Sequence, residues 1–157
     1  MTLRAGLAAL IISLAVPSQA AACTLCSCSA SASGISFGSY DPSASGPNDT
    51  SGTVTLNCTG VVSLMGTIDI AASPGTSGDA TARQLAQGAD RLNYNLYTDS
   101  SRTSIWGTGA NGTSTVTATL NGLLLFSQSV TVYGRIPAHQ WARTGAYADS
   151  VIVTITY

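Results

Sequence analysis

The sequence predicts an all-β protein, an antiparallel β-sandwich of immunoglobulin-like type. Short segments rich in β-branched residues alternate between apolar and polar positions, which is the pattern of strands with one buried face. Turn signals built from Gly, Pro, Asn and Asp separate these segments, and no segment has a helical period. Short strands and turns at this spacing are typical of such a sandwich.

The first element, residues 1–20, is predicted to be a secretory signal peptide. Arg4 supplies its positive charge, residues 7–16 its apolar run, and residues 18–20 the small residues of a cleavage site. The apolar run is shorter than the roughly 20 residues that cross a bilayer. Residues 21–157 are therefore expected to form one exported domain, with no membrane span in the mature chain.

Export places the cysteines in an oxidising compartment. The four cysteines, Cys23, Cys26, Cys28 and Cys58, allow three pairings, and the residues alone do not choose among them. The first three also have the spacing of a metal thiolate cluster, and Cys23 alone is a candidate for lipid attachment. The single histidine, His139, lies far downstream, so disulfides are favoured over a metal site.

The strands of the mature chain are expected in the following order. A strand over residues 35–40 is followed by a loop rich in Ser, Gly and Pro. Later strands are expected at residues 53–58, 61–72, 92–97, 113–120 and 123–133, with polar loops at residues 83–90 and 134–144. The turn signals between them are Pro74-Gly75, Asn111-Gly112 and Asn121-Gly122.

The last strand, within residues 145–157, is β-branched almost throughout and runs into the C-terminal carboxylate. One face of this strand carries four side chains, Val151, Val153, Ile155 and Tyr157. A chain end is normally polar or frayed, so an apolar strand here indicates a core strand. No segment of this sequence follows to cover it.

The composition argues against nucleic-acid binding and against catalysis. Charged residues make up 8% of the chain, against about 25% in an average domain. Lys and Glu are absent, so the chain offers no basic field for nucleic acid and few groups for acid–base chemistry. His139 lies in a loop composition with no Gly-x-Ser-x-Gly elbow to supply a nucleophile, so it is interpreted as a solvated loop residue. We therefore predict no enzyme, no metal and no cofactor.

The two tryptophans, Trp106 and Trp141, admit two interpretations. They could be sugar-stacking platforms, or they could be residues of the core or anchors of loops. The second interpretation is favoured.

Several motifs in register resemble the spore coat protein U domain family. They follow Cys28 in the family order and are FGSYDP at 37–42, NCT at 57–59, Arg83 with LNYNLYTD at 92–99, IWG at 105–107, VYGRIP at 132–137 and GAYADS at 145–150. The resemblance covers nearly the whole mature chain, from Cys28 to Tyr157.

Members of this family are subunits of archaic, Csu-type chaperone–usher pili, and one is a spore coat protein. The resemblance implies a sandwich that lacks its final strand. A periplasmic pilus chaperone, and then another pilin subunit at the outer-membrane usher, would lend that strand. Val151, Val153, Ile155 and Tyr157 would line the acceptor groove. Cys28 would pair with Cys58, as the family cysteines do, which leaves Cys23 and Cys26 for a second disulfide.

One departure from the family concerns the segment that donates a strand. Residues 21–27 are few and contain one large apolar side chain, Leu25, so the segment is expected to be a poor donor. The resemblance then implies a terminal or minor pilus subunit that serves surface attachment and biofilm formation, exported to the periplasm and then to the cell surface. An adhesive binding module and a self-complete secreted coat or matrix protein remain as alternatives.

Overall fold

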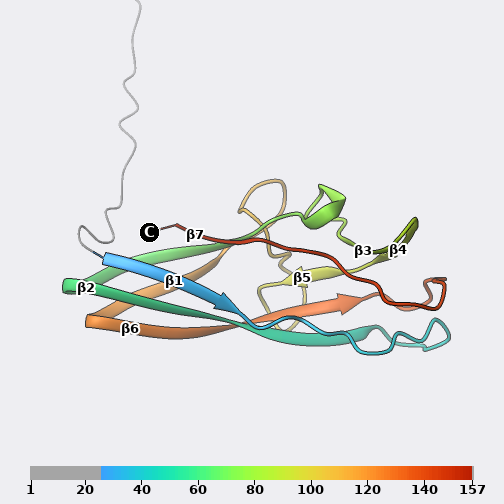
Figure 1. The fold of residues 1–157 in the computed structure, drawn as a ribbon, viewed down its shortest axis with the longest axis horizontal. Coiled ribbons are helices and arrows are strands. Elements are labelled where there is room, and N and C mark those ends of the chain that lie inside the picture. Colours follow the sequence, from blue (N-terminus) through green and yellow to red (C-terminus); the bar gives the residue numbers. More distant parts are fainter. Residues whose placement is uncertain (1–25, 157) are drawn as a thin grey trace, which may run out of the picture.

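The computed structural model describes residues 26–156, apart from the side chains of residues 26, 61–65 and 122–124. It confirms an all-β antiparallel sandwich (Figure 1). Its strands are β1 (Cys26–Ala32), β2 (Asn48–Ala72), β3 (Gln84–Gln87), β4 (Asp90–Asn93), β5 (Asn95–Tyr97), β6 (Val116–Ile136) and β7 (Val153–Thr156). Within the described residues the only helical element is a 3-10 turn, η1 (Gly75–Ser77), so none could span a membrane.

The fold is built on one long antiparallel ladder between β2 and β6. The ladder runs from Asn48 opposite Ile136 to Ile70 opposite Val116. Its register shifts between Thr59 opposite Leu125 and Ser63 opposite Leu123, where four steps along β2 match two along β6. Extra residues on one strand form a bulge, which bends the ladder. Both strands therefore turn back together at one end of the molecule (Figure 1).

Because the ladder turns back, β2 and β6 each contribute to both layers. The first half of β2 pairs with β1 and with the second half of β6, and β6 continues to β5. The second half of β2 pairs with β7 on its other side. β3 and β4 form a separate hairpin, which joins the C-terminal segment through a bridge between Ala86 and Ala148.

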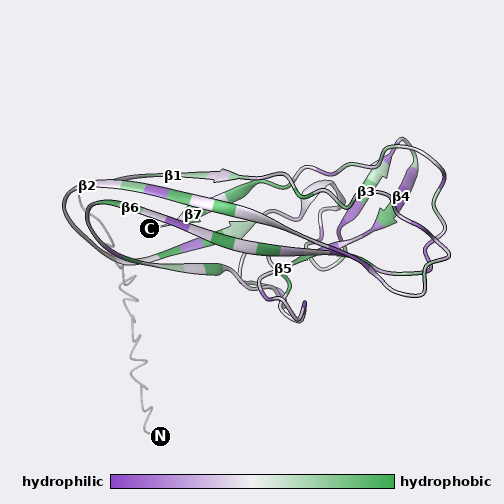
Figure 2. Cartoon of the chain, turned by 90° about the horizontal axis from the view of Figure 1, so that it is seen from below, coloured by the Kyte–Doolittle hydropathy of each residue, from purple (hydrophilic) through white to green (hydrophobic). Residues whose placement is uncertain are grey.

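The core lies between these layers and follows the strand period of two. Apolar and polar residues alternate along β2 and β6 (Figure 2). The buried positions of the two strands are Val54, Leu56, Cys58, Ile68, Ile70, Ala72, Ala118, Leu120, Val132 and Ile136. Trp106 is also buried in the core, and its indole N–H donates a hydrogen bond of 2.9 Å to the Ile70 carbonyl.

Two of the predicted breaks between strands are wrong. Residues 53–58 and 61–72 belong to one strand, and Asn121-Gly122 lies inside β6, opposite Leu64 and Met65. The physical reason is that both strands bend at the same place, so the ladder continues through residues that would otherwise favour a hairpin turn. The Asn111-Gly112 turn is confirmed, with φ of 52° and 77°, the left-handed values that a hairpin turn needs.

Other predicted boundaries are also wrong. Residues 35–40 form no strand and join no sheet, and the predicted loop at residues 83–90 contains β3 and leads into β4. The predicted strand at residues 92–97 is divided between β4 and β5, and the last strand is limited to β7. Residues 35–40 form no strand because no other segment of the described chain pairs with their backbone.

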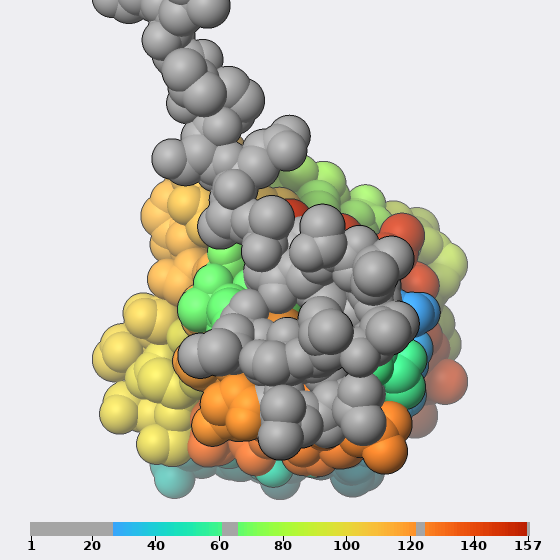
Figure 3. Space-filling view, turned by 90° about the vertical axis from the view of Figure 1, so that its left-hand side faces the viewer, coloured from blue at the N-terminus to red at the C-terminus, as the bar shows by residue number. Residues whose placement is uncertain are grey.

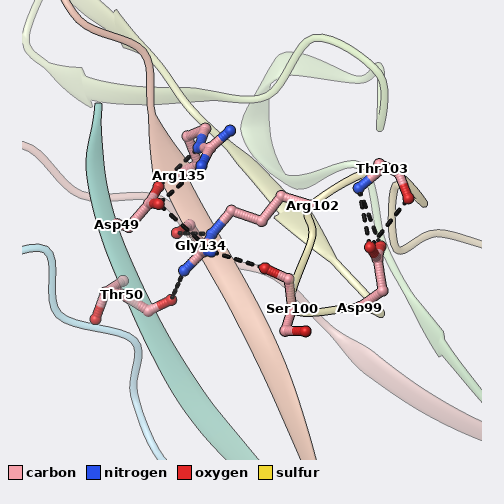
Figure 4. A network of polar contacts seen from close by, with 8 residues as sticks. All are labelled: Asp49, Thr50, Asp99, Ser100, Arg102, Thr103, Gly134 and Arg135. Atoms are coloured by element: carbon pink, nitrogen blue, oxygen red, sulfur yellow. Dashed lines mark hydrogen bonds and ion pairs between the residues drawn. The ribbon is translucent and has the colours of Figure 1, made fainter. Parts of the chain in front are cut away.

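A polar network holds the β5 loop against the β2–β6 ladder (Figure 4). Asp49 accepts two hydrogen bonds from Arg135, of 2.7 and 2.8 Å, and lies 3.4 Å from Arg102. Arg102 also donates to the carbonyls of Thr50, Ser100 and Gly134. The hydrogen bonds from Arg135 lower the pKa of Asp49 below its usual 3.8. Three of the charged residues, Asp49, Arg102 and Arg135, thus join the β5 loop to the ladder.

The Cys28–Cys58 disulfide is confirmed. The two residues face each other in the ladder between β1 and β2, with Cα atoms 4.1 Å apart. Because β1 is an edge strand with one partner, the disulfide attaches it covalently to the centre of its layer. The second predicted pair cannot be placed, because Cys23 lies outside the described residues.

We predict that replacing both Cys28 and Cys58 with Ser lowers the free energy of unfolding by about 3–4 kcal/mol. The residues are 30 positions apart. A disulfide that closes a loop of this length lowers the conformational entropy of the unfolded chain, and the resulting stabilisation has this magnitude. Urea unfolding of the variant and the wild type, followed by far-UV circular dichroism, measures the difference. Equal midpoints under non-reducing conditions would contradict it.

Candidate functional site

One side of the sandwich is open between two extended segments. We call residues 32–40, which begin at the last residue of β1, the N-terminal wall, and residues 143–153, which end at the first residue of β7, the C-terminal wall. A cleft of about 410 Å³ lies between them, with an apolar floor formed by Val54, Leu96, Trp106 and Val132. Seen end-on, β1 and the C-terminal segment lie on the same side of the molecule (Figure 3).

The cleft continues along the same two walls into a second recess of about 490 Å³. Ile35, Phe37, Leu85 and Tyr147 line both cavities, so the two form one groove. The second recess extends to Tyr40 on the N-terminal wall and to residues 143–145 on the other. The groove thus has the shape of a slot along most of both walls.

Two glycines allow the N-terminal wall to lie close to the sheet. A Cβ atom on Gly52 would lie 2.6 Å from Ile35, and one on Gly134 would lie 2.8 Å from the Phe37 ring. The side chains of Asn48 and Thr50 donate hydrogen bonds to the carbonyls of residues 36, 37 and 39. One side of this wall is therefore held by β2.

The C-terminal wall is held in a similar way on its outer side. Ala148 exchanges two backbone hydrogen bonds with Ala86, of 2.8 and 3.1 Å, and Ile152 is bonded through its backbone to Ser73. The residues that alternate with Ala148 and Ile152 lack such hydrogen bonds. Within residues 26–156, the backbone groups of Tyr147, Asp149 and Val151 make no backbone hydrogen bond, nor do those of residues 34–40. Each wall is thus an unpaired strand edge.

Asp149 fixes the middle of the C-terminal wall. Its carboxylate accepts hydrogen bonds from the Tyr94 hydroxyl at 2.7 Å and from the backbone and hydroxyl of Thr76 at 2.9 and 2.8 Å. Burial acts to raise the pKa of Asp149, but these hydrogen bonds and one from the Ser150 backbone outweigh it and keep the pKa below 3.8. The carboxylate is therefore ionised over the physiological range.

Arg83 is buried beneath this contact. Its guanidinium donates hydrogen bonds to the carbonyls of Ser73 and Ala80 and to the side chain of Asn95. Ser73 in turn is bonded to Ile152. The C-terminal wall therefore rests on a buried polar support at residues 149 and 152.

The structure places the predicted groove residues as follows. Val151 and Val153 line the cleft, whereas Ile155 is half-buried against the core, opposite Ile70, outside the lining. Ile152, Thr154 and Thr156 point outward and are exposed. Tyr157 lies outside the described residues, so its predicted place in the groove stays a prediction.

The other singled-out residues divide into core and surface. Trp106 is buried in the floor, as the favoured interpretation had it, but Trp141 is 94% exposed, so that interpretation is wrong for Trp141. His139 is exposed in its loop, with a left-handed φ of 59°. No group of three His, Cys, Asp or Glu residues within residues 26–156 could hold a metal ion.

Sequence reasoning missed the N-terminal wall and two residues of the C-terminal wall, Tyr147 and Asp149. Tyr147 and Asp149 continue the alternation of Val151 and Val153 toward the N-terminus and line the same groove. Extending the period of two backward by two steps would have found them. No local pattern marks residues 32–34, which are small, as one side of a groove.

We predict that Asp149→Asn lowers the free energy of unfolding by about 1–3 kcal/mol at pH 7, because hydrogen bonds to a charged acceptor are lost. The folded-state pKa lies below 3.8, so the contribution is present above that pH and is lost as pH falls through the folded pKa. The stability of the variant should therefore depend less on pH between 5 and 2, by roughly the same amount. Asp69→Asn, an exposed residue bonded only to Thr117, is the control. Parallel pH profiles for wild type and Asp149→Asn in chemical unfolding would contradict the assignment.

Comparison with known structures supports the fold. The chain is similar to a crystal structure of the CsuC–CsuE chaperone–tip adhesion subunit pre-assembly complex from archaic chaperone–usher Csu pili of Acinetobacter baumannii. The TM-score is 0.59 at 19% sequence identity, and the match covers 85% of this chain. It covers 40% of the matched chain, so this protein spans less than half of that neighbour's length.

Sequence comparison identifies the family. The chain is 33% identical to Protein U of Myxococcus xanthus over 143 residues, which covers 84% of this chain and 77% of that protein. The model of the Spore Coat Protein U domain matches residues 14–154, which include both walls of the groove. The chain belongs to the Spore Coat Protein U domain family.

Proposed function

We propose that this protein is a structural subunit of a chaperone–usher type pilus and that its groove accepts a β-strand from a partner protein. The observation that carries the proposal is the pair of walls with free backbone groups on either side of an apolar floor. A strand inserted between them would satisfy both edges and would bury Val151 and Val153. Addition of a strand to an open sheet edge is a common mode of peptide recognition.

The partners follow from this mode of recognition. A periplasmic chaperone would lend the strand first, and another pilin subunit would replace it at an outer-membrane usher. Membership of the family and the fold shared with a chaperone-bound pilus subunit support this assignment. The protein would be exported, with residues 1–20 as its signal peptide, and would act at the cell surface without catalysis or a cofactor.

The position in the fibre is part of the same proposal. Residues from Cys26 onward belong to β1, and Cys28 is bonded to Cys58, so this part of the chain is committed to its own sheet. Any donated strand would have to come from residues before Cys26. A terminal or minor subunit serving surface attachment and biofilm formation is the role that we propose. The pairing of Cys23 with Cys26 belongs to this proposal as well.

The test is the melting temperature of the purified chain with and without a donor peptide. The peptides are the strand segments of a pilus chaperone and of a pilin subunit from the same family. A strand that occupies the groove binds only the folded state, so it stabilises that state by mass action. We expect a rise in the midpoint that increases with peptide concentration. A chain that is stable alone and shows no shift at saturating peptide would be a self-complete coat or matrix protein.

We predict that Val153→Asp abolishes this stabilisation and that Thr154→Asp leaves it unchanged. Val153 lines the cleft, so a carboxylate there would be buried under the donor strand without a partner. Thr154 is exposed on the opposite face of the same strand. Without peptide, Val153→Asp should lower the free energy of unfolding by about 1–3 kcal/mol, because the residue packs against the core.

Thr154→Asp is a matched control because it adds the same charge one residue away in β7. Equal loss of peptide response in both variants would indicate a general effect of charge. An unchanged response in Val153→Asp would show that the strand does not occupy this groove.

A further inference from the structure

Trp141 is the most exposed large apolar residue of the described chain. Its relative exposure is 94%, whereas the other tryptophan, Trp106, is 2% exposed in the core. Elsewhere the outer face is coated mainly with Ser, Thr and Asn, for example Thr55, Asn57, Ser127 and Ser129. A single exposed apolar residue does not by itself mark a binding site, so the surroundings of Trp141 decide its role.

The loop that carries Trp141 is held in place by the residue before it. The Gln140 side chain accepts a hydrogen bond from the Asn93 backbone N–H and donates one to the Asn93 carbonyl, both at 2.9 Å. The Gln140 backbone N–H donates to the Tyr40 hydroxyl at 2.8 Å. On the other side, Ala142 packs against the core. Trp141 is therefore presented to solvent by a fixed backbone, which reduces the entropy cost of binding.

A recess of about 350 Å³ lies beside Trp141. It is lined by Asp90, Arg91, Trp141, Ala142, Arg143 and Tyr147. The two arginines outnumber the one carboxylate, in a chain where only 8% of residues are charged. Arg143 is 84% exposed and lies 3.8 Å from Asp90, so its guanidinium is available to a ligand. Arg91 is exposed and uses one terminal nitrogen for the carbonyls of Gly88 and Asp90.

The recess lies away from the ends of the described chain. β4 and the loop after β6 are at the end of the sandwich opposite the bend of the β2–β6 ladder, far from the C-terminus (Figure 1). Three lining residues of the recess, Ala142, Arg143 and Tyr147, also line the groove. The other three, Asp90, Arg91 and Trp141, do not. The surface around Trp141 is therefore separate from the cleft over Trp106.

We propose that this recess binds a carboxylate-bearing saccharide, such as a uronic acid unit of an acidic polysaccharide. The indole ring offers an apolar face for the C–H face of a sugar ring. Arg91 and Arg143 offer paired N–H donors that match a carboxylate, and Asp90 offers an acceptor for a sugar hydroxyl. A neutral glycan would use the ring but would form no ion pair with either guanidinium group. The site adjoins the strand-binding groove and shares Arg143 with its C-terminal wall, whereas Arg91 and Trp141 lie outside the groove.

The two tryptophans provide a direct measurement. Acrylamide quenches exposed indoles, so the fluorescence of Trp141 should be quenched and that of Trp106 protected. Polygalacturonate, the acidic probe, should protect the quenchable component in a saturable manner at low salt. Dextran, the neutral control, should bind at least about tenfold more weakly, since ion pairs to a guanidinium are lost. Added salt should weaken the binding of polygalacturonate, because exposed charges are screened.

The variants separate the ring from the charges. Trp141→Ala should reduce the affinity for polygalacturonate at least about tenfold, measured by calorimetry, and Arg91→Gln with Arg143→Gln should remove its salt dependence. Leu125→Ala, which removes another exposed apolar side chain from the far end of the molecule, is the matched control. Trp141 is exposed and does not line the groove, so the melting temperature and the response to a donor peptide should be unchanged in Trp141→Ala.

Equal binding of polygalacturonate and dextran, no binding at low salt, or full affinity in Trp141→Ala would each overturn the assignment. The outcome for Trp141→Ala is independent of the donor-peptide experiment, because Trp141 does not line the groove. A chain that binds polygalacturonate and no donor peptide would retain the saccharide site and lose the pilus assignment. A chain that binds only the peptide would do the reverse.

Discussion

The structure depends on the requirement that backbone N–H and C=O groups find partners. The β2–β6 ladder meets this requirement over most of its length, and its bend produces two layers from two strands. The same requirement is only partly met along the two walls. Side chains of β2 bond to the N-terminal wall, and Ala86 and Ser73 bond to the C-terminal wall, but Tyr147, Asp149, Val151 and residues 34–40 make no backbone–backbone hydrogen bond in the described chain. The site is therefore the place where the fold leaves its own hydrogen bonding incomplete.

Support for the open side comes from outside the sheet. The C-terminal wall has no ladder over residues 145–152, apart from the bridge at Ala148, and instead rests on the carboxylate of Asp149 and on Ser73. Buried Arg83 donates a hydrogen bond to the carbonyl of Ser73, and Ser73 is bonded to Ile152 of the wall. A charged side chain, and not a neighbouring strand, therefore supports this part of the wall. Polar side chains are more specific in geometry than apolar ones, and they keep the wall extended while its inner edge is free.

The sequence was sufficient for the fold class, the edge cysteine pair and the facing of Val151 and Val153. The fold class and the facing depend on the period of two along each strand, and the cysteine pair depends on the family motifs. Both can be recognised without knowing which strands pair. It was insufficient where long-range pairing decides: Asn121-Gly122 favours a turn locally but continues a strand because β2 bends beside it. Residues 35–40 have the pattern of a strand and lack only a neighbour. Trp141 was misjudged because nothing in its sequence context reveals that Gln140 turns it outward.

The direction of the long ladder has a mechanical consequence. β2 and β6 run along the longest axis of the molecule (Figure 1), so a pull along that axis loads their hydrogen bonds in shear, all at once. Bonds loaded together must break together, whereas bonds pulled across the strands open one after another. The Cys28–Cys58 link ties the edge strand β1 into the same load-bearing layer. Tension applied along this axis would therefore meet far more resistance than tension applied across it.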